Sequence, residues 1–339
     1  MDSNKDGTNR VTIIAEAGVN YNGDISLAKQ MVRVAREAGA DIVKFQTGYP
    51  KEDISVYASK ADYQKASTGA DESQLEMCSK LMLPDEVYPE LVECCEDEGI
   101  EFLSTPFDIP SVDLLVSVGQ RKWKIPSGEI TSLPLLLYIA KRHEPVILST
   151  GMCTLDEIGT AIGILRDNGV DDLTVLQCNT NYPTPYEEAN VLAMVTLRER
   201  FGVKVGYSDH TNGIVVPVAA TALGASVIEK HFTLDKNMPG PDQKASMDPD
   251  ELKAFVRVVR DTEVALGTGV KVPSRSEEKI KDVVRKSIVA RYPIKKGEIL
   301  TEKNITWKRP GDGISAMRWF EVLGTTAVRD FAPDEQIEL

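Results

Sequence analysis

Short apolar segments rich in Val, Ile and Leu alternate with amphipathic helical segments along most of the chain. Each short segment has the length and the β-branched content of a buried strand. The helical segments include 26–39, 84–99, 154–169 and 216–225, and several of them end at a Gly, a common residue after a helix. The expected strands cover residues 11–18, 41–47, 101–107, 121–129, 145–151, 173–180, 203–209 and 226–233.

Eight strand–helix units within roughly 260 residues have the count and the length of a (β/α)8 TIM barrel. A doubly wound open sheet is the alternative, because the sequence does not reveal the order of the strands. The glycine pattern GxGxxG, which such sheets use to bind dinucleotides, does not follow the first strand. We therefore expect an α/β barrel as the catalytic domain over residues 1–267, with a last helix at 247–267.

The pattern changes after residue 267. Residues 268–285 are polar and charged, and we expect them to form a linker. Residues 286–339 contain short strand patterns and the turns "KKGE" and "PGDG", which predict a small β-rich domain. Because a unit of this size has a small core, we expect it to dock on another surface.

Composition and charge narrow the class of function. The formal net charge of −13 argues against nucleic acid or an anionic membrane as the main partner. The N-terminus is polar and no apolar run approaches the roughly 18–20 residues of a membrane span, so a cytoplasmic protein is predicted. The five cysteines form no CxxC pair, which argues against a disulfide framework or a structural zinc site.

Polar residues gather at the C-terminal ends of all eight expected strands, where a simple core would stay apolar. In a barrel these ends meet at one mouth, which is where barrel enzymes hold their active sites. We therefore predict an active site there rather than a solvated rim. The residues concerned are Glu16, Lys44, Gln46, Thr105, Lys124, Ser127, Glu129, Ser149, Thr150, Asn179, Thr180, Ser208, Asp209, His210, Glu229 and His231.

Two of the three histidines lie at neighbouring strand ends. His210 ends the seventh expected strand and His231 ends the eighth. Because neighbouring strands lie about 4.8 Å apart, the two imidazoles could share one divalent metal, with water, substrate oxygens or a carboxylate as further ligands. His143 precedes the fifth strand at the other face, and we expect it to be structural or exposed.

Lys44 and Lys124 lie inside otherwise apolar strands. A buried ammonium group without a partner is costly, so either an anion or a carboxylate such as Glu16 or Glu129 must face each lysine. A phosphate or carboxylate ligand is the functional interpretation, and a structural Lys–Glu pair is the alternative. Nearby hydroxyls supply further donors of the kind that phosphate sites use, namely Thr105, Ser127, Ser149 and Ser208.

Ten motifs follow one another along the chain in a fixed order. They are "IAEAGVNYNGD", "KFQT", "FLSTPFD", "KIPSGEI", "VILSTGM", "CNTNYPTPYE", "GYSDHT", "EKHFT", "MPGPDQKASMDP" and "KRPGDGIS". With these motifs the chain resembles the sialic acid (nonulosonate) synthases over nearly its whole length. Residues 286–339 resemble the antifreeze-like (SAF, β-clip) domain that these enzymes carry.

The resemblance implies a transferase that forms a carbon–carbon bond from phosphoenolpyruvate. The family condenses it with the aldehyde form of an N-acetylated mannose-type sugar and releases phosphate by C–O cleavage. A divalent ion, Mn²⁺ or Mg²⁺, is implied on His210 and His231, with the two histidines counted among the catalytic residues. Glu16 is the expected acid/base.

The resemblance also implies which residues hold each substrate. Phosphoenolpyruvate is assigned to Lys44, Thr105, Lys124, Ser127, Ser149 and Ser208. The sugar is assigned to Gln46, Glu129, Tyr182, Asp242 and Arg309. In this family the antifreeze-like domain is exchanged across a homodimer, so the resemblance implies that Arg309 of "KRPG" reaches the site of the partner subunit.

Three motifs indicate a branch within the family. "IPSGEITSLP", "CNTNYPTP" and "KRPGDGISAM" are similar to the bacterial enzymes that make N,N'-diacetyllegionaminate. Their sugar lacks the 6-hydroxyl and carries a second acetamido group, and Pro126 could reshape that end of the pocket. Tyr21 stands where relatives often have His, and it is not counted as a metal ligand. An N-acetylneuraminate synthase that uses N-acetylmannosamine is the alternative.

Two further alternatives share parts of this pattern. A metal-dependent aldolase or a deoxy-octulosonate phosphate synthase would use the same mouth without needing the C-terminal domain. A non-catalytic carbohydrate-binding or ice-binding protein would explain the C-terminal domain, but it gives no reason for polar ends on eight strands.

Overall fold

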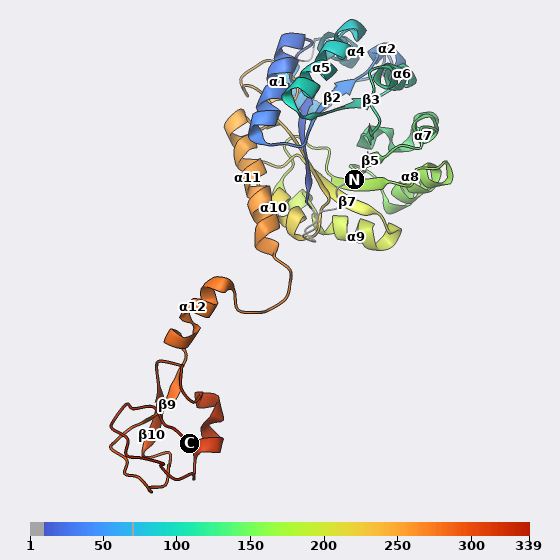
Figure 1. Cartoon of the computed structure of the whole chain (residues 1–339). Coiled ribbons are helices and arrows are strands. Elements are labelled where there is room, and N and C mark those ends of the chain that lie inside the picture. The colour runs from blue at the N-terminus through green and yellow to red at the C-terminus, as the bar shows by residue number, and fades with distance from the viewer. Residues whose placement is uncertain (1–9, 70) are drawn as a thin grey trace. The chain divides into compact units, whose positions relative to one another are not determined.

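The computed structural model describes residues 10–69 and 71–339. Internal contacts divide it into two units, one that ends at Thr268 and a second that spans Gly269–Leu339. Figure 1 shows a large unit of strands and helices in blue to orange and a smaller one in orange to red. Each unit is described by itself below.

The first unit contains eight parallel strands. They pair in the order β3-β2-β1-β8-β7-β6-β5-β4, and the two end strands β3 and β4 contact each other, which closes the barrel. The prediction of a TIM barrel is confirmed. The strands are β1 Thr12–Gly18, β2 Ile42–Thr47, β3 Glu101–Pro106, β4 Trp123–Ile125, β5 Val146–Ser149, β6 Leu173–Cys178, β7 Lys204–Asp209 and β8 Val227–His231.

Helices surround the strands of this unit (Figure 1). Several begin at a side chain that accepts a backbone N–H. Asp24 does so for α1, and Gly39 ends that helix with a φ of 87°. The helices of the unit are α1 Ile25–Ala38, α2 Pro50–Asp53, α3 Asp62–Thr68, α4 Gln74–Leu81, α5 Tyr88–Glu98, α6 Ile109–Ser117, α7 Leu133–Ala140, α8 Leu155–Asp167, α9 Leu192–Phe201, α10 Val215–Ala222 and α11 Pro249–Leu266.

The side chains inside the barrel form an apolar layer below a polar one. The alternation of side chains along each strand sends one set inward and the other toward the helices. The inward apolar layer is Ile14, Ile42, Leu103, Ile147, Leu176 and Val227. Two residues further along β1, β2 and β8, the same face carries Glu16, Lys44 and Glu229. The polar layer therefore lies toward the C-terminal ends of the strands.

The fourth predicted strand is much shorter than expected. β4 ends at Ile125, and the 3₁₀ helix Ser127–Thr131 follows directly. Pro126 has no N–H to donate to a strand ladder, which accounts for the early end. The residues Ser127 and Glu129 are thus on a turn above the strand.

The second unit has its own small core. Strands β9 (Ser287–Ala290) and β10 (Ile305–Lys308) pair antiparallel, and a short helix α13 spans Trp319–Val322. Buried apolar residues such as Ile288, Leu300 and Phe331 form the core. The segment 268–285, expected to be a linker, contains helix α12 (Arg275–Val284), which begins with a capping box of Ser274 and Glu277.

No helix in the described part of the chain is long and apolar enough to cross a membrane.

Candidate active site

A narrow cavity of about 60 Å³ opens at the C-terminal ends of the barrel strands. It brings together every residue predicted for catalysis, metal binding or phosphoenolpyruvate binding, and two of those predicted for the sugar. The lining residues are Glu16, Lys44, Gln46, Thr105, Phe107, Lys124, Pro126, Ser127, Ser149, Cys178, Tyr182, Ser208, His210, Glu229 and His231.

Lys44 lies in a fully buried set of polar partners. Its ammonium nitrogen Nζ is 2.6 Å from Glu16 Oε2 and 3.8 Å from Glu229 Oε1, and it donates to Thr105 Oγ1 at 2.9 Å. Glu16 Oε1 also accepts a hydrogen bond from Gln46 Nε2 at 3.3 Å. Neighbouring strands cause this convergence, since Glu16 pairs in register with the Lys44 backbone, and Gln46 with that of Thr105.

Lys124 reaches the same centre from the opposite side of the barrel. Its Nζ donates to Glu229 Oε1 at 3.1 Å, and Ser208 Oγ donates to the same oxygen at 3.1 Å. The Oγ of Ser149 is buried and has no hydrogen-bond partner in the described part of the chain. A buried hydroxyl of this kind is a donor ready for an anionic oxygen.

The two carboxyl groups of this cluster differ in their pKa. Burial raises the pKa of Glu229, but Lys124 and Lys44 outweigh this effect and bring that pKa to about 2. Burial raises the pKa of Glu16 to about 7, despite the opposing charge of Lys44. At neutral pH the cluster therefore has two ammonium groups facing one firmly ionised carboxylate and one that exchanges a proton, which favours binding of an anion.

The two imidazoles lie side by side at the rim of the cavity. The ring centroids of His210 and His231 are 5.3 Å apart. His210 Nδ1 lies 2.5 Å from the backbone oxygen of Asn179, so Nδ1 carries the proton and Nε2 remains an acceptor. Burial lowers the pKa of His231 well below its usual value, and its Nδ1 is buried without a hydrogen-bond partner in the described residues.

These two residues fit the ligand chemistry of a divalent ion. A metal-bound histidine usually donates its other ring nitrogen to a carbonyl or carboxylate, as His210 does to Asn179. A metal ligand must also be a neutral imidazole with a nitrogen free to bind the ion. His231 has a lowered pKa, and its buried Nδ1 has no hydrogen-bond partner among the described residues. Within residues 10–69 and 71–339, no group of three or more His, Cys, Asp or Glu forms a metal site. The remaining ligands would have to come from water and substrate.

The residues predicted for the sugar are only partly brought together. The ring of Tyr182 lies tilted against that of His210, with centroids 4.0 Å apart, and edge-on to that of His231, with centroids 5.6 Å apart. Glu129 and Asp242 do not line the cavity. Asp242 is buried and interacts electrostatically with His210, and Glu129 interacts in the same way with Asp53.

Arg309 belongs to the second unit. Its side chain is exposed, and Nε donates to the backbone oxygen of Val284 at 3.0 Å. His143, at the opposite end of the barrel, is exposed, and its Nδ1 lies 3.4 Å from the backbone oxygen of Gly169.

Two polar strand-end residues point away from the cavity. Asp209 Oδ2 pairs with Lys230 Nζ at 2.6 Å in the layer between strands and helices, and both side chains are almost fully buried. Thr150 donates to the backbone oxygen of Leu176. Both support the wall of the barrel.

Two residues of the cavity lining, Cys178 and Phe107, were not among the predicted site residues. Cys178 lies two residues after the inward-facing Leu176, so strand alternation could have found it; its Sγ is 3.8 Å from His210 Nδ1. Phe107 follows β3 and gave no such signal. Tyr21 is buried against the ring of Phe45 and donates to the backbone oxygen of Gln46, so it supports the cavity without lining it.

Comparison with known families matches the two units separately. The NeuB family pattern matches residues 31–271, and the SAF domain pattern matches residues 285–338.

The chain belongs to the NeuB family. The expected relationship to the sialic acid synthases is thereby confirmed. The chain is 52% identical over 330 residues to an N,N'-diacetyllegionaminic acid synthase of Campylobacter jejuni, covering 97% of this chain and 99% of that protein. It is 46% identical over 317 residues to the protein of the same name from Legionella pneumophila, covering 92% and 89%.

The solved structure of a relative has the same fold as this NeuB-family protein. The N-acetylneuraminic acid (sialic acid) synthetase of Leptospira borgpetersenii, crystallised with citrate, is 32% identical and superposes with a TM-score of 0.72. The match covers 82% of this chain and 94% of that chain. The arrangement of the barrel is therefore that of a known synthase fold.

Proposed function

We propose that this protein is an N,N'-diacetyllegionaminate synthase. It would condense phosphoenolpyruvate with 2,4-diacetamido-2,4,6-trideoxymannose, and release phosphate. The observation that carries the proposal is the identity of 52% to a synthase of this acid over almost the whole of both chains. The polar cavity at the barrel mouth supplies the groups that this reaction needs.

Phosphoenolpyruvate carries a phosphate and a carboxylate, which suit the ammonium groups of Lys44 and Lys124. The hydroxyls of Thr105, Ser149 and Ser208 supply neutral donors beside them. Because Glu16 and Glu229 already pair with these lysines, the substrate would replace part of the present lysine–carboxylate pairing. Such an exchange favours a dianionic ligand over a neutral one.

The reaction forms one carbon–carbon bond and breaks one carbon–oxygen bond. Carbon three of phosphoenolpyruvate attacks the aldehyde carbon, and water adds to the carbon two cation. The tetrahedral carbon then expels phosphate to leave the 2-keto acid. Glu16, whose pKa is about 7, can accept the proton released by water and donate it to the aldehyde oxygen.

A divalent ion, Mn²⁺ or Mg²⁺, would be held by the acceptor nitrogens of His210 and His231. When bound, it would polarise the aldehyde as a Lewis acid. The protein's part is to orient the rings, which the Asn179 carbonyl does for His210, and burial favours the neutral form of His231.

Part of the cavity wall suits a deoxy sugar. Phe107 and Pro126 are apolar members of an otherwise largely polar lining. A methyl group at the sugar's carbon six gains from such a surface, whereas a hydroxyl would lose its hydrogen bonds there. The polar groups of the sugar would contact the remaining predicted residues, which are Gln46, Tyr182, Glu129 and Asp242.

Product mass after incubation with phosphoenolpyruvate, Mn²⁺ and each sugar tests the proposal. We expect turnover of the 2,4-diacetamido-2,4,6-trideoxy sugar, with one phosphate released per product. A clear preference for N-acetylmannosamine would make the protein an N-acetylneuraminate synthase instead. Product formation from pyruvate in place of phosphoenolpyruvate, with no phosphate released, would indicate an aldolase.

A further inference from the structure

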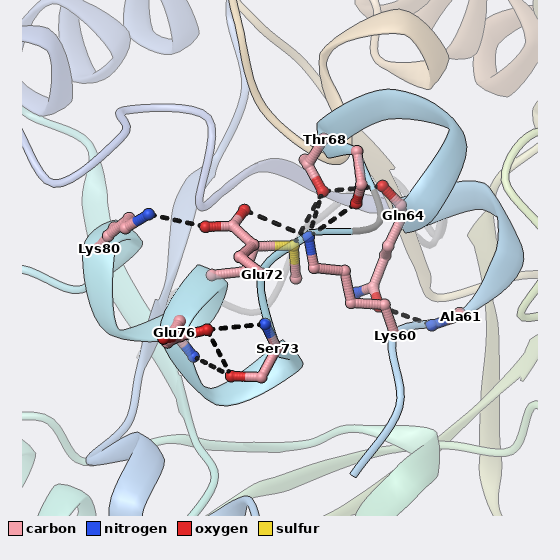
Figure 2. Close-up of polar contacts among 10 residues, drawn as sticks. Lys60, Ala61, Gln64, Thr68, Glu72, Ser73, Glu76 and Lys80 are labelled. Carbon is pink, nitrogen blue, oxygen red and sulfur yellow. Dashed lines mark hydrogen bonds and ion pairs between the residues drawn. The ribbon is translucent and has the colours of Figure 1, made fainter. Parts of the chain in front are cut away.

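Lys60 is a buried lysine in the insertion between β2 and β3. Its side chain is 2% exposed, and Nζ donates to Thr68 Oγ1 and the Gly69 backbone oxygen at 3.0 Å each. It also pairs with Glu72 Oε1 at 3.2 Å (Figure 2). Burying the Lys60 ammonium group costs desolvation energy even with these partners. We therefore expect such a buried charge where its hydrogen bonds hold the chain in one conformation.

This network joins the end of α3 to the start of α4. Glu72 Oε2 also accepts from Lys80 Nζ at 2.7 Å, so the carboxylate holds both ends of α4 (Figure 2). Ser73 and Glu76 cap the same helix reciprocally. We call Lys60, Glu72 and Lys80 the α4 lock.

α4 in turn lies against the loop that follows β1. Met77 and Leu81 of α4 form a buried cluster with Val19. A side chain at Gly23 would meet the Lys80 backbone oxygen at 2.8 Å, so the two backbones are in close contact. The position of the β1–α1 loop therefore depends on α4.

The β1–α1 loop holds the segment that carries Asp242. Asn22 Nδ2 donates to the backbone oxygen of Pro239 at 2.8 Å, and Asn20 Nδ2 donates to Ser246 Oγ at 2.9 Å. Ser246 Oγ in turn donates to the backbone oxygen of Asp242 at 2.7 Å. A continuous series of contacts thus runs from the α4 lock to a residue proposed to bind the sugar.

Open space lies beside this series of contacts. A cavity of about 480 Å³ is lined by Thr68, Glu72 and Lys80 of the insertion and by residues 239–241 of the opposite loop. Because the helix and the loop are not packed tightly there, α4 has room to shift when the lock is broken.

We infer that Lys60 is a positioning residue for the sugar end of the active site, acting through α4 and the β1–α1 loop on the segment 239–246. The inference rests on the proposed function for the identity of the substrate. The phosphoenolpyruvate end is held by strand residues such as Lys44 and Lys124, which the lock does not contact.

The kinetic test compares Lys60→Met with a matched control. Met fills a similar volume without charge, and Glu72 keeps Lys80 as its partner. We expect the KM for the sugar to rise roughly tenfold, as for a small displacement of a binding group, while the KM for phosphoenolpyruvate changes less than about twofold. The control is Lys65→Met, since Lys65 is 43% exposed and pairs with Asp62 one turn away on the same helix. Equal changes in both KM values, or none, would overturn the inference.

Hydrogen–deuterium exchange gives a readout that does not need activity. In Lys60→Met the amides of 74–81 and 239–246 should exchange faster than in the wild type, while those of α8 stay unchanged. Unaltered exchange over 239–246 contradicts the inference. If the wild type forms no product with either sugar, the proposed function fails, and exchange alone decides the role of Lys60.

Discussion

Glu229 is the residue around which the polar end of the barrel is organised. Its Oε1 accepts from Lys124 and Ser208, and Lys44 lies 3.8 Å away. A buried carboxylate is tolerated only with such compensation. One acidic residue on β8 therefore requires basic and hydroxyl residues on the strands around it, which is why the polar pattern recurs on so many strands.

At the residue scale, the histidine pair makes a prediction about metal removal. Chelation should abolish product formation, and Mn²⁺ should restore it. His210→Asn should weaken Mn²⁺ binding at least roughly 10–100-fold, because one of the two proposed protein ligands is lost. Titration calorimetry measures the affinity, with His143→Asn at the opposite end of the barrel as the control. Full activity after chelation would contradict the metal proposal.

Asp242 predicts how stability depends on pH. Burial raises the pKa of this carboxyl from 3.8 to about 6. A raised folded-state pKa contributes stability below pH 3.8 that is lost as the pH rises through about 6. The Asp242→Asn variant lacks this titration, so it does not lose this stability as the pH rises. The free energy of unfolding of the variant minus that of the wild type should therefore increase between pH 4 and pH 7, by on the order of 2–3 kcal/mol. Urea unfolding at several pH values checks this; a constant difference would show that Asp242 does not titrate in this range.

At the scale of the element, each strand builds two different environments. On β8, Glu229 points into the cavity, whereas the next residue, Lys230, points outward and pairs with Asp209 of β7. The period of two along a strand causes this separation. The lysines that face the cavity are the ones proposed to bind phosphoenolpyruvate. The Lys230–Asp209 pair on the outer face of the strands supports the wall of the barrel.

Substitution of the two lysines separates these roles. Lys230→Met leaves the buried Asp209 without its partner and should lower the free energy of unfolding by about 3–5 kcal/mol, without changing the KM for phosphoenolpyruvate. Lys124→Met should raise that KM at least about tenfold by removing a charged contact to the substrate. Denaturant unfolding and steady-state kinetics measure both variants. A raised KM in Lys230→Met would show that the two layers are not independent.

At the scale of the whole molecule, the proposed sugar-binding Arg309 lies in a different unit from the other site residues. The second unit has its own core, with Ile288 and Phe331 buried in it. We propose that the protein forms a homodimer in which this unit supplies Arg309 to the site of the partner. Exchange of a small unit between protomers is a common route to a dimer.

Mixing two inactive variants tests this exchange. His231→Ala disables the barrel and Arg309→Ala disables the second unit, so a mixed dimer would hold one complete site. We expect co-refolded mixtures to recover roughly a quarter of wild-type activity, from random pairing of subunits. Sedimentation confirms the oligomeric state. If the mixture stays as inactive as each variant alone, Arg309 does not act on a partner.

The sequence by itself determined the architecture and most of the cavity. Alternating strand and helix patterns and Gly helix ends are local signals, so they predicted the barrel. Because parallel strands end at one face of the barrel, the strand pattern also predicted that His210 and His231 would lie close together. What the strand pattern could not reveal lies on turns and insertions, such as Phe107 and the early end of β4 at Ile125.

Only the tertiary structure decided which side chains share a contact across the barrel. Lys124 and Glu229 are 105 residues apart. The contacts of Lys60 lead to a loop that follows β8 through α4 and the β1–α1 loop. Such contacts depend on closure of the sheet and on how loops of different length pack over its mouth. Local sequence patterns do not predict which side chains make these contacts, because the interactions that form them are between residues far apart in the chain.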